Sequence, residues 1–325
     1  MSERSTRILT LFAFGAVYLI WGSTYLAIRF AIETLPPFLM AGVRFLTAGS
    51  LLYAWQRLRG TPAPNRTQWR HATVIGAFLL LGGNGGVVWA EQYVPSGLTA
   101  LLVSTEPLWI VLLSWLAFNH QRPNAKLVFG MLLGFSGVAI LIGPQNLSGA
   151  SSGTFVSFVV LLAAASWALG SLYSIRHNHS STPLLTISMQ MLAGGALLLT
   201  AGLVTGEWRM LNLEAVSLRS LLALSHLIIF GSMVAFSAYI WLLSAVSPAR
   251  ASTYAFVNPV IAVLLGWAIA GEPITTSTMI AAVLIIGAVT AIVLNTSGEK
   301  KTADAKEGTR GELEPIAEQR ELCEA

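Results

Sequence analysis

The sequence has a single cysteine, Cys323, which lies in the polar segment at the end of the chain. A lone cysteine forms no disulfide within the chain, so a small disulfide-stapled scaffold is excluded. Charge is also scarce, because only 10% of the 325 residues are Asp, Glu, Lys or Arg, whereas soluble domains average about 25%. Together with 54% hydrophobic residues, this scarcity predicts an integral membrane protein.

Aspartate is missing from residues 1–296, where all seven acidic residues are Glu. Without paired aspartates or an HExxH spacing, this region does not carry the constellation that an intramembrane hydrolase needs. The phosphate-binding pattern GxxxxGK[ST] is absent too, so no ATPase is built into the chain. The histidines show no metal-ligand spacing. We therefore expect no enzyme activity, no metal and no cofactor.

Long apolar runs follow one another along most of the chain, and about 20 apolar residues are enough to cross a bilayer. The run nearest the N-terminus reaches about Phe30, which is too long for a cleavable signal. The pattern predicts an all-α membrane protein with ten spans, at residues 8–30, 36–56, 71–90, 95–118, 125–143, 154–175, 184–205, 219–241, 249–270 and 276–295. Nine or eleven spans remain an alternative, and either would put the termini on opposite sides.

The distribution of Lys and Arg predicts the orientation. With both termini inside, the cytoplasmic segments carry ten of these residues and the outer ends and loops carry three, as the positive-inside rule requires. The formal net charge of +4 then needs no nucleic-acid partner. Residues 297–325 are polar and poor in aromatics, which predicts a disordered cytoplasmic tail.

Residues 94–118 form the most informative span, because Glu106 lies near its middle and is followed directly by Pro107. A carboxylate at membrane depth costs about 3 kcal/mol on insertion scales. Pro107 also leaves the carbonyl of Val103 without its helical partner. Such groups are tolerated only where they face protein or water, so this helix is expected to line a cavity.

Residues 246–272 repeat the same pattern. Asn258-Pro259 matches Glu106-Pro107, and Trp267 matches Trp115 at the same offset along the chain. Two helices broken by proline at matching places of two halves are a sequence pointer to a transporter's binding site. We therefore predict two repeats, residues 8–143 and 154–296. Because each holds five spans, an odd number, the second is expected to be inverted in the membrane.

Three stretches carry a family resemblance: WGSTYLAIRFAIETLPPFLMAGVRFLTAG at 21–49, GGNGGVVWAEQYVPSGLTALLVSTEPL at 82–108 and SPARASTYAFVNPVIAVLLG at 247–266. The chain resembles the EamA family of the drug/metabolite transporter superfamily and, within it, the YedA-like bacterial exporters. The resemblance covers residues 8–296 and implies ten helices, cytoplasmic termini and efflux of small molecules across the bacterial inner membrane. Because Asn258 stands where the first repeat has Glu106, equal roles for the two positions stay open.

Glu106 and Arg44 are the two charged candidates for a substrate site. Glu106 is interpreted either as a protonatable or cation-pairing group in the cavity or as a structural acid paired with Arg44. Arg44 lies inside the second span, where it could hold a substrate carboxylate through two hydrogen bonds or neutralise Glu106. We expect the two side chains to lie within ion-pair reach.

Uncharged polar side chains fall at a similar depth, namely Asn84, Asn258, Ser104 and Thr105. Each could bond a neighbouring helix, and as a set they suggest a polar cavity. Glu91 lies with Gln92 at the outer end of the third span, where interfacial solvation accounts for it.

Aromatic side chains recur near the same depth. Those assigned to the cavity are Trp21, Tyr25, Trp167, Tyr173 and Tyr254. The alternative is an aromatic belt at the membrane interface, but Trp21, Trp167 and Tyr254 lie too deep for it. Aromatic walls suit amphiphilic or cationic cargo.

These observations predict a secondary transporter that exports small organic metabolites, amino acids or drugs by alternating access. The alternatives are an uptake carrier or a facilitative, channel-like protein of the same fold. The expected partners are a small-molecule substrate, membrane lipids and protons as the coupling ion. The oligomeric state, including a homodimer, stays open.

Overall fold

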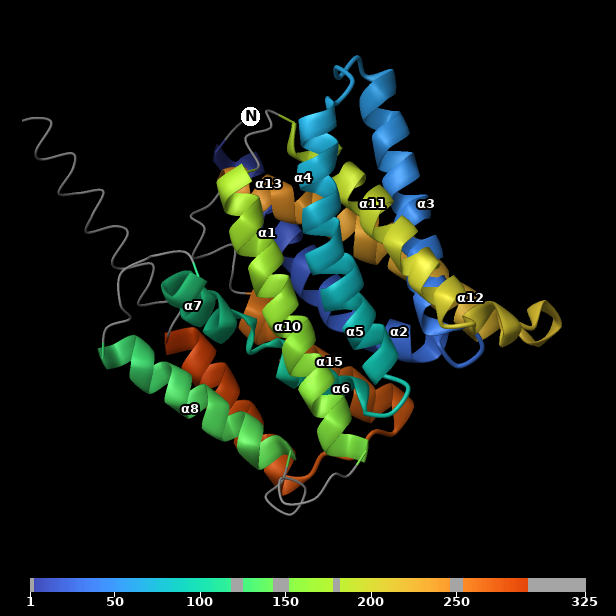
Figure 1. Ribbon diagram of the computed structural model, residues 1–325. Helices are drawn as coiled ribbons and strands as arrows, with labels where there is room; N and C mark the ends of the chain where they lie inside the picture. Colours follow the sequence, from blue (N-terminus) through green and yellow to red (C-terminus); the bar gives the residue numbers. More distant parts are fainter. Residues whose placement is uncertain (1–2, 118–124, 143–151, 178–181, 246–253, 292–325) are drawn as a thin grey trace, which may run out of the picture.

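A computed structural model describes residues 3–117, 125–142, 152–177, 182–245 and 254–291, and in these ranges every regular element is a helix (Figure 1). The predicted disordered tail, residues 297–325, lies outside them. The prediction of an all-helical chain is therefore confirmed for the described residues.

Seven helical stretches are long and apolar enough to cross a membrane, namely Ile8–Ala31, Pro37–Leu58, Arg66–Ala90, Ser96–Leu116, Gly153–His177, Pro183–Val204 and Leu218–Tyr239. Three shorter apolar helices accompany them, at Leu127–Leu141, Val257–Ala270 and Thr276–Ala291. This arrangement fits a multi-pass membrane protein. Three of the ten predicted spans thus fall on helices of 10–17 residues.

Three of the long stretches contain a π-helical segment. They are α1 (Glu3–Ala16), η1 (Val17–Trp21) and α2 (Gly22–Ala31); α4 (Arg66–Gly76), η2 (Ala77–Asn84) and α5 (Gly85–Ala90); and α12 (Leu218–His226), η5 (Leu227–Val234) and α13 (Ala235–Ala245). The π-helix bonds each amide to the fifth carbonyl back and frequently occurs at functional sites. The η2 and η5 segments have equal length and occupy the third and eighth predicted spans.

The fourth predicted span divides into α6 (Ser96–Val103) and α7 (Glu106–Ala117). Pro107 lies in the first turn of α7, where no amide donor is required. The hydroxyls of Ser104 and Thr105 donate to carbonyls three residues back, at 2.7 and 2.6 Å. These two side chains therefore satisfy their own broken helix, and the predicted bonds to a neighbouring helix are not seen for them.

The matching break at Pro259 is absent. The helix α15 (Tyr254–Ala270) continues through Pro259, so this part of the prediction is wrong. A proline in a helix removes one amide donor and displaces one carbonyl, and it bends or ends the helix according to how its neighbours satisfy that carbonyl.

The two halves of the chain are interleaved. The helix α10 (Ser152–His177) packs against η2, α5, α6 and α7, whereas α2 packs against α12 and α15 (Figure 1). Each half therefore places its first helix against the other half. The remaining described helices are α8 (Ala125–Ile142) and the short η3 (Glu207–Arg209) and η4 (Leu213–Ala215).

The helices α3 (Pro37–Leu58) and α11 (Pro183–Val204) make the broadest helix pair. Each begins with proline in its first turn, where the fixed φ suits a helix start. A Cβ added to Gly49 would lie 2.9 Å from the Cβ of Met191, closer than real Cβ atoms approach. Small residues permit this approach between helices in lipid.

Replacing Gly49 by Val should therefore lower the stability of the folded protein by about 1–3 kcal/mol, the usual cost of overpacking. Unfolding of the purified protein in detergent measures this loss. Gly287→Val is the matched control, because a Cβ there meets nothing within 4 Å. Equal stability of the two variants would contradict close packing of α3 on α11.

Candidate functional site

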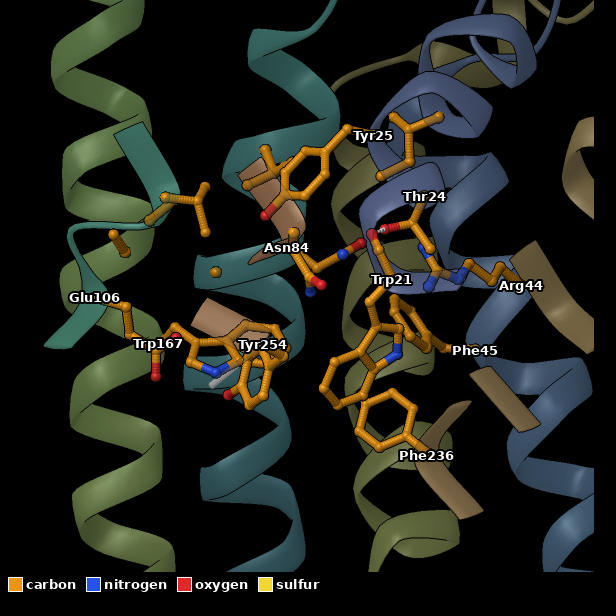
Figure 2. A pocket seen from close by; sticks show the side chains of 17 residues that line it. Trp21, Thr24, Tyr25, Arg44, Phe45, Asn84, Glu106, Trp167, Phe236 and Tyr254 are labelled. Carbon is orange, nitrogen blue, oxygen red and sulfur yellow. Dashed lines mark hydrogen bonds between the residues drawn. The ribbon is translucent and has the colours of Figure 1, made fainter. Parts of the chain in front are cut away.

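A cavity of about 130 Å³ lies between the two halves of the chain. Its lining comes from η1, α2, α3, η2, α5, α6, α7, α10, α13 and α15 (Figure 2). The residues that line it are Trp21, Thr24, Tyr25, Ile28, Arg44, Phe45, Gly83, Asn84, Val87, Val103, Glu106, Ala163, Ala164, Trp167, Phe236, Tyr254 and Asn258. Sites for drug-sized ligands usually reach about 300–1,000 Å³, so the cavity in this conformation suits a compact molecule.

One wall is aromatic. The Trp21 ring lies 5.2 Å from the Phe236 ring and 5.1 Å from the Tyr254 ring, both in edge-to-face arrangements. Tyr239 completes the cluster, 5.3 Å from Trp21 and 5.5 Å from Tyr254. Edge-to-face packing at these distances fixes ring orientation and adds about 0.5–1.5 kcal/mol per pair beyond burial. The wall is therefore preformed.

Two hydrogen bonds join π-helical segments to side chains of the other half of the chain. The indole nitrogen of Trp21 donates to the carbonyl of Gly231 in η5, at 3.1 Å. The hydroxyl of Ser166 in α10 donates to the carbonyl of Phe78 in η2, at 2.8 Å. In each case a side chain from the other half bonds a carbonyl of the π-segment. A carbonyl of η5 and a carbonyl of η2 thus each accept a hydrogen bond from the other half.

Arg44 is held on one side of the cavity. It is 4% exposed, and its Nε donates to the hydroxyl of Ser232 at 2.9 Å. Its Nη1 has no hydrogen-bond partner among the described residues. A buried donor without an acceptor costs about 1–3 kcal/mol, more when charged, so this atom is available to an anionic or carbonyl oxygen.

Two amide oxygens in the same cavity also lack partners among the described residues. They are Oδ1 of Asn84 and Oδ1 of Asn258. An amide oxygen accepts hydrogen bonds, so each of the two can accept one from a ligand or from water. Asn84 lies between Tyr25 and the Trp21–Thr24 side of the cavity in Figure 2.

Glu106 lies on the wall opposite Arg44, beside Trp167 (Figure 2). No ion pair joins Glu106 to Arg44 in the described part of the chain, where the ion pair found is between Arg219 and Glu33, at 3.1 Å. The expectation that the two candidates lie within ion-pair reach is therefore wrong in this conformation. Glu106 is left free to meet a cation or a proton in the cavity.

The structure brings eight of the nine candidate substrate-binding side chains to the lining of one cavity: Trp21, Tyr25, Arg44, Asn84, Glu106, Trp167, Tyr254 and Asn258. Tyr173 is the exception. Its hydroxyl lies 2.9 Å from Nδ1 of His71, and its ring stacks on His177 with centroids 4.1 Å apart. Tyr173 therefore belongs to a cluster outside the cavity wall.

Sequence reasoning missed Thr24, Phe45 and Phe236, which also line the cavity. Thr24 is adjacent to Tyr25 and Phe45 is adjacent to Arg44. Neither residue type indicates a binding site by itself. Glu91 was misread as a solvated interfacial residue. Gln92 beside it is exposed, whereas Glu91 is fully buried.

Comparison with known proteins adds the family context. The model of the EamA-like transporter family matches residues 8–143 and again residues 154–294. The chain is 41% identical over 294 residues to the uncharacterized inner membrane transporter YedA of Escherichia coli K12, covering 90% of this chain and 93% of that one. It is 25% identical over 277 residues to the uncharacterized transporter YoaV of Bacillus subtilis, covering 83% and 91%.

A solved crystal structure shares the fold, with a TM-score of 0.59 over 88% of this chain and 97% of that one. Its sequence identity of 21% makes it evidence for the fold alone.

Proposed function

Because the chain belongs to the EamA-like transporter family, we propose that it is a secondary transporter that exports small organic metabolites, amino acids or drugs across the bacterial inner membrane. The observation that supports this most is the cavity shared by the two halves, which is lined by buried polar atoms without a partner among the described residues. A buried polar group without a hydrogen bond destabilises the protein unless a ligand or water bonds to it. Transport follows if the cavity opens to each side in turn.

The proposed architecture is ten transmembrane helices in two inverted five-helix repeats, with both termini in the cytoplasm. Two separate matches to the family model support the duplication. The two eight-residue π-segments and the reciprocal packing of α2 and α10 on the opposite half support it as well. In such folds, rocking of one repeat against the other exposes a central site alternately.

The wall chemistry favours a compact cargo with an acceptor group and a donor group. A cargo carboxylate would meet the free Nη1 of Arg44, since Arg binds planar anions through fixed, paired donors. An ammonium or hydroxyl would meet the oxygens of Asn84 and Asn258. The aromatic wall around Trp21 would hold an apolar or cationic portion.

Glu106 is proposed as the site of proton coupling. It lies in the cavity wall without an ion-pair partner among the described residues. A carboxyl in this position can bind a proton from one side of the membrane and release it to the other. Cargo and proton movement are then linked through the same cavity.

The experiment begins with a growth-protection screen against amino acids, their analogues and cationic toxins, comparing overexpressing cells with deletion cells. Each protective compound is then tested as radiolabelled cargo in proteoliposomes. We expect saturable flux with counterflow, and loss of both in Trp21→Ala but not in Tyr173→Phe. Flux that never saturates and shows no counterflow would point to the channel alternative and overturn the carrier.

The direction of transport is read from the same vesicles. Accumulation of cargo on the side that corresponds to the cell exterior supports export, whereas accumulation on the cytoplasmic side supports the uptake alternative. A homodimer stays a prediction, which the mass of the protein in lipid nanodiscs would decide.

A further inference from the structure

Glu91 is a buried acid that lies outside the cavity wall. It follows α5 directly, is fully buried, and neither carboxyl oxygen has a hydrogen-bond partner among the described residues. A buried carboxylate is normally paired or hydrogen-bonded, since the ionised form is otherwise strongly penalised. The neutral, protonated acid is the form that this environment accommodates.

The charged groups around Glu91 come from three other elements. They are Arg29 in α2, Arg44 in α3 and Glu272 after α15, and the phenol of Tyr25 also interacts with Glu91 electrostatically. Arg29 does not pair with the carboxyl, because its Nη1 donates to the backbone carbonyl of Glu91 at 2.7 Å. Arg29 is thus engaged by the backbone of Glu91.

Glu272 differs from Glu91 in having a full set of donors. Its Oε1 accepts from the amide and the hydroxyl of Ser96, both at 2.8 Å, and its Oε2 accepts from the amide of Gly97 at 3.0 Å. Donors at a helix N-terminus favour a carboxylate. Of the two neighbouring acids, Glu272 therefore holds the negative charge, and the proton goes to Glu91.

The electrostatic surroundings of Glu91, which lies just beyond the span that ends at Ala90, also favour its protonated form. Burial raises the pKa of its carboxyl well above the usual range, the Glu272 carboxylate adds to the shift, and Arg29 and Arg44 oppose it. A raised pKa means that this carboxyl keeps its proton at a higher pH than an ordinary glutamate does.

Arg44 is a candidate counter-ion for the Glu91 carboxylate. Its Nη1 is unpartnered in the same state in which both carboxyl oxygens of Glu91 are unpartnered. A buried guanidinium and a buried carboxylate that each have atoms without a partner are stabilised by pairing with each other. A movement of Arg44 away from Ser232 toward Glu91 would therefore expel the proton.

We propose that Glu91 is a second proton-binding site of this protein, at the end of α5, and that Arg44 becomes its counter-ion when the proton leaves. In this step the O–H bond of the Glu91 carboxyl breaks, the proton passes to water, and the carboxylate pairs with the guanidinium. The part that this proton plays in transport rests on the proposed function. The protonation itself does not.

Infrared difference spectroscopy tests the site without any cargo. The full chain in lipid nanodiscs is titrated, and the C=O stretch of protonated carboxylic acids is followed. The background is Glu106→Gln, so that Glu106 contributes nothing to the band. We expect a band that persists at neutral pH in this background and disappears in the double variant Glu106→Gln, Glu91→Gln.

A band of unchanged size in the double variant would overturn the proposal. A second variant leaves Glu91 in place, which keeps the test valid if Glu91→Gln does not fold. In Glu106→Gln, Arg44→Gln the counter-ion is gone, so the band should persist to a proton concentration about tenfold lower, equivalent to about one pKa unit. A midpoint that does not move would refute Arg44 as the counter-ion. Both results are independent of whether the protein transports anything.

Discussion

Glu106→Gln is expected to abolish the pH-driven accumulation of cargo while exchange of cargo across the membrane continues. A gradient of about one pH unit is worth about 1.4 kcal/mol per proton and can sustain a roughly tenfold cargo gradient. Gln keeps the shape of the side chain but binds no proton at neutral pH. The variant should therefore reach a cargo ratio of about one under a pH gradient, with counterflow preserved.

The measurement uses proteoliposomes loaded with the cargo that the growth screen identifies. Glu214→Gln is the matched control, because Glu214 is exposed in a short helical turn away from the cavity, and it should behave as wild type. Full pH-driven accumulation in Glu106→Gln would remove Glu106 from the coupling step. If the variant loses both counterflow and pH-driven accumulation, Glu106 serves in cargo binding instead.

Arg44→Gln is expected to weaken the binding of a carboxylate-bearing cargo by about 10- to 150-fold. The estimate follows from the roughly 1.5–3 kcal/mol of a hydrogen bond to a charged group. Nη1 of Arg44 is buried without a partner among the described residues and stands in the cavity wall, so its loss should act on the bound anion. Arg44→Lys should recover only part of the affinity, because an ammonium cannot reproduce the two parallel donors.

The same variant measured with an amide or ester analogue of the cargo isolates this contact. Such an analogue has no negative charge, so wild type and Arg44→Gln should bind it with similar affinity. Arg59→Gln is the control for an arginine outside the cavity, where the side chain is exposed and lies over Trp55. Equal losses for the acid and its analogue would show that Arg44 shapes the fold rather than the anion site.

The sequence located the cavity because charge and proline are costly inside a membrane. Glu106, Arg44 and Asn258 stand out against an apolar background, and all three line the same cavity. This reasoning fixes depth along a helix but not the direction in which a side chain points. Arg44 and Glu106 were accordingly expected to pair, although they lie on opposite walls (Figure 2).

Three other predictions from the sequence were wrong because they depended on packing around a single residue. Tyr173 was assigned to the cavity by its place in the repeat, but the helix carries it to a contact with His71. Pro259 was expected to break a helix that continues through it. Glu91 was judged by its nearness to the end of a span, but the folded chain buries it fully. The π-segments leave no period in the sequence that separates them from an ordinary apolar helix.

The most direct test of the carrier is whether the cavity opens to the two sides in alternation. With Cys323 replaced by Ser, a single cysteine replaces Ile28 or Phe236. These two cavity-lining residues lie near the ends of the stretches Ile8–Ala31 and Leu218–Tyr239, which finish on opposite sides of the membrane in the proposed topology. A membrane-impermeant thiol reagent is applied to intact cells and to inverted vesicles, with and without cargo. We predict that any condition raising the labelling of one cysteine lowers that of the other, whereas labelling that rises at both positions together would contradict alternating access.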